Sequence, residues 1–208
     1  IPIIVDVDES ITMDPKALAA AAGPRTRAVV PVHMWGLPCD MDAICRVARK
    51  CKLLVVEDAC QAVGGAYEGR MLGAIGDAGA FSFNYYKNMT CGEGGAVATN
   101  DDQAAQRAAC MIDCCRFYWD GRPDGFRPFI SNGARASEIE GAIINVQLDR
   151  LKGMIQATRR QKKRVLAETA GSGLTPIRAN SPDYECGTQV MYTLPTTEAA
   201  DEFARLTG

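Results

Sequence analysis

The sequence predicts an α/β protein built on a mainly parallel β-sheet. Two apolar runs, at residues 53–56 and 78–83, do not alternate polar with apolar residues, which is typical of strands buried on both faces of a sheet. Segments with strand and helix patterns alternate along the chain, as in successive β-α-β units. Both runs lead into polar residues, and open α/β sheets bind their ligands at the ends of their strands.

The first half of the chain supplies most of the predicted sheet. A short apolar strand is expected at residues 3–7, followed by a helix that begins at Asp14, where proline and then alanines follow the capping aspartate. Gly23-Pro24 ends that helix. Further strands are predicted at residues 28–33, 52–58, 78–83 and 95–99, and further helices at residues 40–50 and from Asn100-Asp101 onward.

The second half begins with a predicted loop at residues 117–131, which is dense in aromatic residues, Gly and Pro. Its rings, next to arginine and aspartate, suit a sugar or nucleotide surface. Equally, Phe117, Tyr118 and Trp119 could pack a subunit interface, where such residues are enriched. Ser137 is expected to cap an apolar-faced helix. A helix at residues 154–170, a strand at 189–194 and a helix at 197–206 complete the predicted elements.

The composition fits a globular chain, since 47% of the 208 residues are apolar and 23% are charged. The net charge of -2 argues against a nucleic-acid partner, because nucleic-acid-binding surfaces are strongly basic. No stretch has the length of a membrane span and the start lacks a signal-peptide pattern, so no membrane partner is expected. The chain begins without Met inside a predicted strand, which indicates a fragment or a processed product.

The nine cysteines are odd in number and lie in apolar segments. This distribution indicates a reduced, cytoplasmic compartment in which most thiols are small buried side chains. Cys110, Cys114 and Cys115 are close in sequence, but the chain has no CxxC pair and His33 is its only histidine. We therefore expect no metal site.

A Cys-His hydrolase is a further interpretation of these residues. His33 could activate Cys60 or Cys91 as a nucleophile. No distinct signature surrounds either thiol. A structural role for His33, or a place at the edge of a pocket, is favoured instead.

The chemistry centres on Lys87 and on the polar residues at two predicted strand ends. The first strand stops at Glu57-Asp58 and the second leads through Ser82 to Lys87. A lysine can hold an aldehyde cofactor as a Schiff base only if its amine can lose its proton, which burial or nearby positive charge promotes. An aspartate can keep a pyridine nitrogen protonated, which makes the ring an electron sink.

Each of these residues also has a plainer interpretation. Lys87 could be a solvated side chain that follows an aromatic run. Asp58 could cap a helix, and Ser82 could be a small strand residue. The ordered set, rather than any single residue, carries the specificity.

Four segments in this order and spacing resemble the core of the DegT/DnrJ/EryC1/StrS family of pyridoxal-phosphate sugar aminotransferases. They are EDACQA at residues 57–62, GD at 76–77, FSFNYYKN at 81–88 and GEGGAVATND at 92–101. RAVVPVHMWGLPCDMDAI at residues 27–44 is similar to the family's segment of a strand ending in PVH, an aromatic-Gly pair and an aspartate before a helix.

The resemblance implies a three-layer, fold-type-I large domain at residues 1–153, with its N-terminal part absent. Residues 154–208 would form the connecting helix and the truncated start of a smaller C-terminal α+β domain. On this expectation the chain lacks the Gly-Thr/Ser phosphate loop of the family and the aromatic residue that stacks on the cofactor ring.

The resemblance also assigns roles to five residues around pyridoxal 5'-phosphate. Lys87 would form the internal aldimine and shuttle the proton, Asp58 would pair with the pyridinium nitrogen, and Gln61 would lie along the ring edge. Ser82 would hold the phosphate, and Asn132 would reach the cofactor phosphate of the other subunit. The pattern around Asn132 departs from the family, because it lies three residues before arginine instead of two.

The implied function is a cytoplasmic, homodimeric aminotransferase with active sites shared between subunits. It would move an amino group from glutamate or glutamine to a keto-sugar, commonly a nucleotide-linked one. Two alternatives stay open. Some members of the family are sugar dehydratases, but these carry histidine where this chain has Lys87, and the chain could also be a non-catalytic or regulatory homologue.

Overall fold

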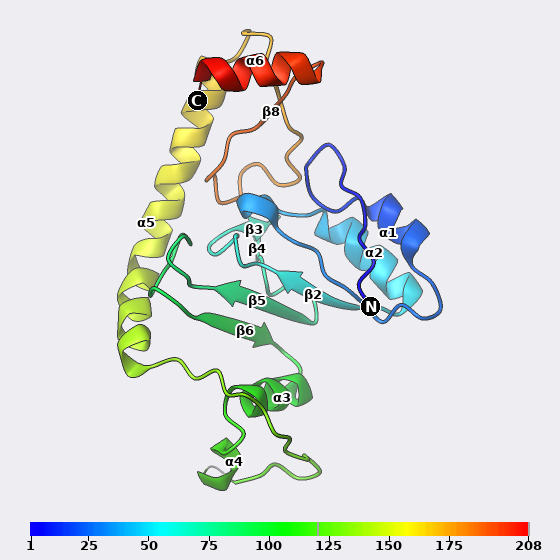
Figure 1. Cartoon of the computed structure of the whole chain (residues 1–208), viewed down its shortest axis with the longest axis vertical. Coiled ribbons are helices and arrows are strands. Elements are labelled where there is room, and N and C mark those ends of the chain that lie inside the picture. The colour runs from blue at the N-terminus through cyan, green and yellow to red at the C-terminus, as the bar shows by residue number, and fades with distance from the viewer. Residues whose placement is uncertain (120, 208) are drawn as a thin grey trace.

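The computed structural model describes residues 1–119 and 121–207, which fold around a four-stranded sheet (Figure 1). Its strands, in spatial order, are β1 (Ala28–Val29), β2 (Leu54–Asp58), β5 (Ala78–Ser82) and β6 (Gly95–Thr99). β1 pairs with β2 and β2 pairs with β5 in parallel, whereas β6 runs antiparallel to β5. The predicted mainly parallel sheet is therefore confirmed.

Two capped helices precede β2 along the chain. α1 (Pro15–Ala21) begins after Asp14, whose side chain accepts a hydrogen bond from the Lys16 N–H, with proline in the first turn. The one-turn 3-10 helix η1 (Met34–Gly36) leads to α2 (Met41–Cys51), which is capped by Asp40. α2 ends at Lys52 in the left-handed conformation, and β2 begins two residues later.

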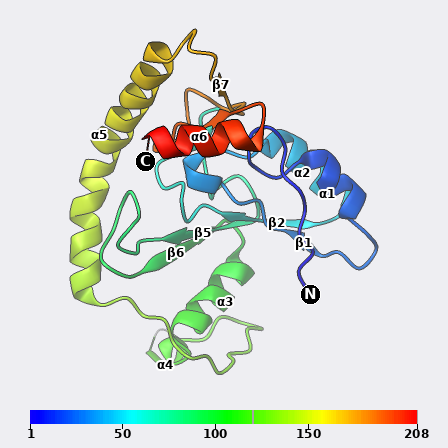
Figure 2. The same ribbon diagram turned by 45° about the horizontal axis from the view of Figure 1, so that its top comes forward.

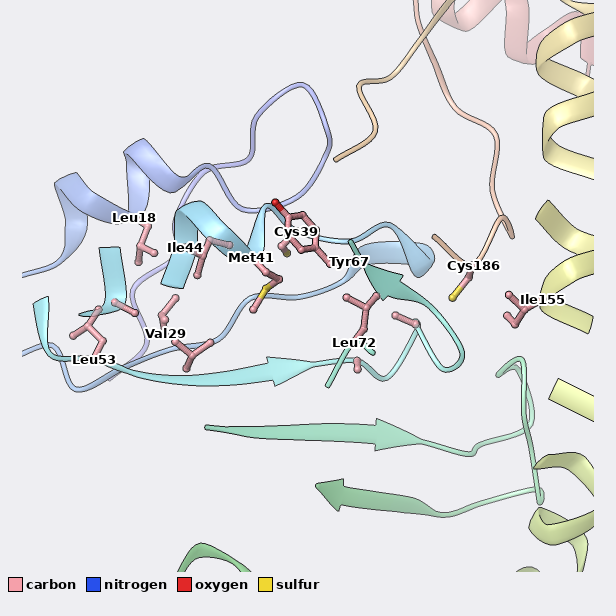
Figure 3. Packing of buried hydrophobic residues seen from close by; sticks show 14 residues of the cluster. Leu18, Val29, Cys39, Met41, Ile44, Leu53, Tyr67, Leu72, Ile155 and Cys186 are labelled. Atoms are coloured by element: carbon pink, nitrogen blue, oxygen red, sulfur yellow. The ribbon is translucent and has the colours of Figure 1, made fainter. Parts of the chain in front are cut away.

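The hydrophobic core lies between these helices and one face of the sheet (Figure 3). Leu18 of α1 and Ile44 of α2 pack in one cluster with Val29 of β1 and Val55 of β2. The cluster continues towards the C-terminal half of the chain through a further group of buried residues: Tyr67, Leu72, Ile155 and Cys186. It thereby joins the sheet to the long helix α5 (Glu138–Glu168).

The remaining elements surround the sheet and the long helix. Two short antiparallel pairs are formed by β3 (Ala66–Tyr67) with β4 (Arg70–Met71) and by β7 (Thr175–Pro176) with β8 (Tyr192–Thr193). The helices are α3 (Asp102–Ile112), α4 (Arg116–Trp119), α5 (Glu138–Glu168) and α6 (Thr197–Thr207). α5 runs along one side of the molecule, past the ends of β5 and β6, in both views (Figures 1 and 2). None of the helices in these ranges is long and apolar enough to cross a membrane.

Several predicted elements differ from the structure, and the strand expected at residues 28–33 is limited to β1 and an isolated bridge at Val32. Residues 3–7 form only a bridge between Val7 and Met13, because no described strand lies beside them. The helix expected after Ser137 and the helix expected at residues 154–170 are one continuous helix, α5, since no capping residue or proline interrupts it at residue 153. The strand at 189–194 is limited to β8, and the loop at 117–131 starts with the single turn of α4. The domain boundary between residues 153 and 154, which falls inside α5, stays a prediction.

The sheet has one covered and one open face among the described residues. Val55 and Glu57 are buried on the covered face, whereas Leu54, on the other face, is 58% exposed. By strand register and alternation, Val30 and Val97 project from the same side as Leu54, and they are 50% and 56% exposed. Within the described residues, the core formed with α1 and α2 packs against one face of the sheet, and coverage of the second face stays a prediction.

Candidate active site

Asp58 and Ser82 lie at the same edge of the sheet. Asp58 is the last residue of β2 and pairs with Ala80 of β5, and Ser82 follows two residues later as the last residue of β5. Because side chains alternate along a strand, Asp58, Ala80 and Ser82 project from one face. Both polar side chains are half-buried. A carboxylate and a hydroxyl therefore lie on the same face of the sheet, where β2 and β5 end.

The backbone fixes the position of Asp58. Its N–H donates to the carbonyl of Pro31 at 2.9 Å, and its carbonyl accepts from the N–H of His33 at 3.0 Å. Its Oδ1 accepts a hydrogen bond from the N–H of Cys60 at 3.0 Å. Residues 59–65 form turns rather than a helix, so the carboxylate caps a turn and the helix-cap interpretation of Asp58 is wrong.

Lys87 lies in the loop that follows β5. Its N–H donates to the carbonyl of Asn84 at 3.1 Å, which closes a turn, and its side chain is half-buried. None of the ion pairs between described residues includes Lys87. A half-buried lysine without a carboxylate partner is unlike the solvated surface lysine of the plainer interpretation, and its amine is open to a ligand.

Cys60 connects Asp58 and Lys87 electrostatically. Burial and then the neighbouring Asp58 raise the pKa of the Cys60 thiol to about 11, while the charge of Lys87 opposes this rise. Asp58 and Lys87 therefore act on the same thiol with opposite signs. Because its pKa is high, Cys60 stays a neutral thiol at neutral pH and is a poor nucleophile.

Gln61 contacts the turn of η1 instead of standing free. Its Oε1 accepts the N–H of Trp35 at 2.8 Å. Trp35 and Gly36 both have positive φ, and a Cβ on Gly36 would lie 2.6 Å from the Cβ of Cys186. Gln61 therefore holds the tight turn of η1 next to the end of β2 through its side-chain oxygen. The amide nitrogen of Gln61 donates no hydrogen bond to the described residues.

The second acid at this strand end has a structural role that sequence reasoning missed. Glu57 is completely buried and accepts four hydrogen bonds, from the His33 ring and from the N–H groups of Gly73, Ile75 and Gly76. Burial raises the pKa of Glu57, but these hydrogen bonds outweigh it and leave the pKa below its ordinary value.

The Glu57 contacts pull residues 73–76 tightly against the sheet. A Cβ at Gly79 of β5 would lie 2.0 Å from the carbonyl oxygen of Gly73, so this strand position requires glycine. The glycines at 73, 76 and 79 were the available sequence signal. Their spacing alone, however, does not say which acid they face.

The structure rules out the hydrolase interpretation of His33. One ring nitrogen, Nε2, lies 3.0 Å from the Glu57 carboxylate, and the other, Nδ1, accepts the N–H of Cys39 at 3.2 Å. Because both nitrogens have partners and the ring is fully buried, neither can activate Cys60 or Cys91. The structural role expected for His33 is the one observed.

Ser82 and Asn132 have different surroundings. The hydroxyl of Ser82 accepts only a long hydrogen bond, 3.4 Å, from the N–H of Asn84, and it remains available to a ligand. Asn132 is exposed and lies beside the end of α3, where Ser131 and Ala134 bond to α3 carbonyls. It has no hydrogen bond to the described site residues, so its role towards a second subunit stays a prediction.

A sequence model of the DegT/DnrJ/EryC1/StrS aminotransferase family matches residues 1–206. The chain belongs to this family. The match includes the strand-end residues Asp58 and Ser82 and the loop that carries Lys87.

Two curated relatives show how much of a similar protein the chain covers. It is 40% identical over 164 residues to the GDP-perosamine synthase of Caulobacter vibrioides, covering 76% of this chain and 42% of that protein. It is 35% identical over 189 residues to a putative L-glutamine:3-amino-2,3-dideoxy-scyllo-inosose aminotransferase of Streptoalloteichus tenebrarius, covering 88% and 44%. The chain thus spans less than half the length of these curated relatives.

A solved structure shares the fold of this chain. The structure of DesI in the presence of its TDP-sugar product matches with a TM-score of 0.78 and 33% identity, over 93% of this chain and 48% of that one. This likeness confirms the predicted fold class, an α/β aminotransferase fold of type I.

Proposed function

We propose that this chain carries the cofactor lysine of a pyridoxal-phosphate-dependent aminotransferase that transfers an amino group from glutamate or glutamine to a keto-sugar. The observations that support the proposal are that Lys87 is half-buried without an acid partner among the described residues, and that its loop follows β5, which ends in Ser82 next to the end of β2 at Asp58. Membership of the aminotransferase family supports the reaction type.

The donor set at this edge fits pyridoxal 5'-phosphate group by group. When bound, this cofactor supplies an aldehyde that captures amines and a pyridine ring that withdraws electrons from the carbon undergoing proton transfer. Lys87 offers an amine for the aldehyde, Asp58 a carboxylate for the ring nitrogen and Ser82 a hydroxyl for the phosphate. The amide nitrogen of Gln61 would complete the ring edge.

The chain's own residues then perform the proton transfers. Once the donor amine has taken its place, Lys87 Nζ is free to accept the proton from the α-carbon of the amino acid. Asp58, fixed by Pro31, His33 and Cys60, would offer its carboxylate to the ring nitrogen. The donor would leave as a 2-oxo acid at the end of this first half-reaction, while its amino group stays at the site. In the second half-reaction the keto-sugar would take that amino group, and Lys87 Nζ would give a proton to the sugar carbon that gains it.

We propose a nucleotide-linked keto-sugar as the acceptor. One relative is a GDP-perosamine synthase, and the DesI structure was obtained with a TDP-sugar product. The surface expected for sugar stacking is partly used within the chain, since Phe117 packs on Phe126 with ring centroids 4.8 Å apart, and Arg107 lies over Phe129. Tyr118 is 81% exposed, while the side chain of Trp119 lies outside the described part of the structure.

We also propose that the protein acts in the cytoplasm as a homodimer with shared active sites. All nine cysteines are free thiols, as a reduced compartment requires. Three exposed apolar residues of α5, Ile139, Ile143 and Val146, are spaced four and three residues apart and form one face of the helix. A second copy would cover this face and bring Asn132, which lies a few residues before it, towards the partner's site.

An amino-transfer assay with nucleotide-linked keto-sugars tests the proposed function. Lys87→Ala should reduce turnover by at least about a thousandfold, since a positioned acid–base group contributes up to about 10⁴ in rate. Lys50→Ala, which removes an exposed lysine at the end of α2, is the matched control and should leave the rate unchanged. Normal turnover by Lys87→Ala would overturn the proposal. A sugar product that has lost oxygen without gaining nitrogen would identify a dehydratase instead.

A further inference from the structure

Two adjacent thiols lie in the turn between α3 and α4. The Sγ atoms of Cys114 and Cys115 are 4.0 Å apart, Cys115 is exposed and Cys114 is half-buried. The proposed function uses neither residue. Side chains of adjacent residues usually point in different directions. The conformation of this particular turn is therefore what brings the two sulfur atoms together.

Asp113 sets the conformation of this turn. Its N–H donates to the carbonyl of Ala109 and ends α3, while its carbonyl accepts the N–H of Arg116 at 3.1 Å. Its Oδ1 accepts the N–H of Cys115 at 3.0 Å, and its Oδ2 lies 3.4 Å from a guanidinium nitrogen of Arg135. The side chain of Asp113 therefore holds the backbone of Cys115 in place. The turn that carries both sulfur atoms is fixed by these hydrogen bonds.

The pair has the chemistry of a dithiol rather than of a metal site. Among the described residues no group of three or more His, Cys, Asp or Glu side chains is arranged to hold a metal ion. The nearest cysteine in sequence, Cys110, is buried, and its sulfur exchanges hydrogen bonds with the backbone of Phe129. Cys114 is the main reason that the pKa of Cys115 is raised, because the two thiols share a hydrogen bond.

We propose that Cys114 and Cys115 form a vicinal dithiol that a disulfide oxidant closes to an intramolecular disulfide. One thiolate attacks a sulfur of oxidised glutathione, forms a mixed disulfide and releases one glutathione. The neighbouring thiol loses its proton, attacks the protein-bound sulfur and releases the second glutathione. The protein loses two protons and two electrons, the oxidant is reduced to two glutathione thiols, and the sulfur–sulfur distance falls to about 2 Å.

The disulfide would fix the start of the loop at residues 117–131. α4 follows Cys115 directly, and the Tyr118 N–H donates to the carbonyl of Cys115. Closing the ring between adjacent residues restricts the backbone of this turn, so the direction in which α4 leaves α3 depends on the redox state of the pair. The inference rests on the turn itself and does not depend on the proposed function.

Peptide mapping after exposure to oxidised glutathione tests this site. The protein is treated, its remaining thiols are alkylated, and it is digested with trypsin, which releases residues 108–116 with Cys110, Cys114 and Cys115 together. We expect this peptide to be two hydrogen atoms lighter, with one alkyl group, on Cys110. Cys51, an exposed thiol elsewhere in the chain, serves as the internal control and should carry glutathione or an alkyl group.

Phenylarsine oxide, which bridges two neighbouring thiols, is an independent probe of the reduced pair. One equivalent of phenylarsine oxide should bind the wild-type protein and prevent oxidised glutathione from forming the Cys114–Cys115 disulfide. Cys114→Ser and Cys115→Ser should each abolish binding of the arsenical. Cys51→Ser should retain it. Separate alkylation or glutathionylation of Cys114 and Cys115, or capture of the arsenical that survives both substitutions, would overturn the proposal.

Discussion

Lys87 and Asp58 derive their proposed chemistry from their surroundings. The loop after β5 leaves the Lys87 amine half-buried without a carboxylate partner, and the end of β2 holds Asp58 by two backbone hydrogen bonds. Their positions at or after strand ends could be predicted from sequence because each belongs to a short motif next to an apolar strand pattern. The contact between Gln61 and Trp35 could not, since it depends on how the turn of η1 meets a segment 26 residues away.

Asp58→Asn should retain the fold and lose activity. The amide oxygen can still accept the N–H of Cys60, so the turn is preserved, but a neutral side chain no longer favours a proton on the ring nitrogen. We expect unchanged thermal unfolding and a fall in turnover of about 10² or more, the lower bound for a lost, positioned proton-transfer effect. Turnover equal to that of the wild type would contradict the role given to Asp58.

Glu57 should make stability depend on pH in the acid range. Its carboxylate has a folded-state pKa below 4.5, its ordinary value, so its stabilising effect is present above that pH and is lost as the pH falls through the folded-state pKa. Glu57→Gln should lower the free energy of unfolding at neutral pH by about 3 kcal/mol, because an amide nitrogen would face backbone N–H donors. Urea unfolding across this pH range measures both effects.

The matched control is Glu93→Gln, which changes an exposed glutamate in the same way. It should leave the unfolding free energy and its pH dependence close to those of the wild type. A Glu57→Gln variant that keeps the full acid-induced loss of stability would show that other carboxylates cause it.

At the scale of elements, α5 links the sheet to the C-terminal segment. Lys162 on α5 forms an ion pair with Glu185 in which the side chains are only 10% and 4% exposed. The next residue, Lys163, pairs with Asp183, where both side chains are exposed. Oε2 of Glu185 has no hydrogen-bond partner among the described residues, and within them the Glu185 carboxylate forms an ion pair with Lys162 alone.

Lys162→Met should destabilise the protein by about 3–5 kcal/mol, because it leaves an uncompensated buried carboxylate. Lys163→Met, the matched control one residue away, should have little effect, since exposed pairs contribute little. Denaturant unfolding of the two variants compares them directly. Adding Glu185→Met to Lys162→Met should recover most of the loss, and equal effects of the two single substitutions would contradict this account.

The elements also show where sequence reasoning stops. The caps of α1, α2 and α5 could be predicted, because a capping side chain bonds to residues two or three positions away. The continuity of α5 could not, since Gly153 is tolerated inside a helix that packs on other elements. The exposed face of the sheet could not be predicted either. An apolar strand pattern indicates that both faces pack against something, but it does not identify the segment that packs there.

At the scale of the whole molecule, the exposed apolar face of α5 predicts self-association. Val146→Glu, at a residue that is 61% exposed, should convert the proposed dimer to a monomer, because a charge would be buried in the interface. Leu206→Glu on α6, at a residue that is 68% exposed, is the matched control and should leave the dimer intact. Sedimentation velocity measures the mass of each, and a wild-type monomer would contradict this prediction.

The most direct test of the central claim, that Lys87 holds the cofactor, is reduction with borohydride followed by peptide mapping. The protein is mixed with pyridoxal 5'-phosphate, its visible absorbance is recorded before and after borohydride, and the labelled peptide is sequenced. The account predicts an absorbance band that borohydride removes, with one pyridoxyl group on Lys87. A label on another lysine, or no band at all, would contradict it.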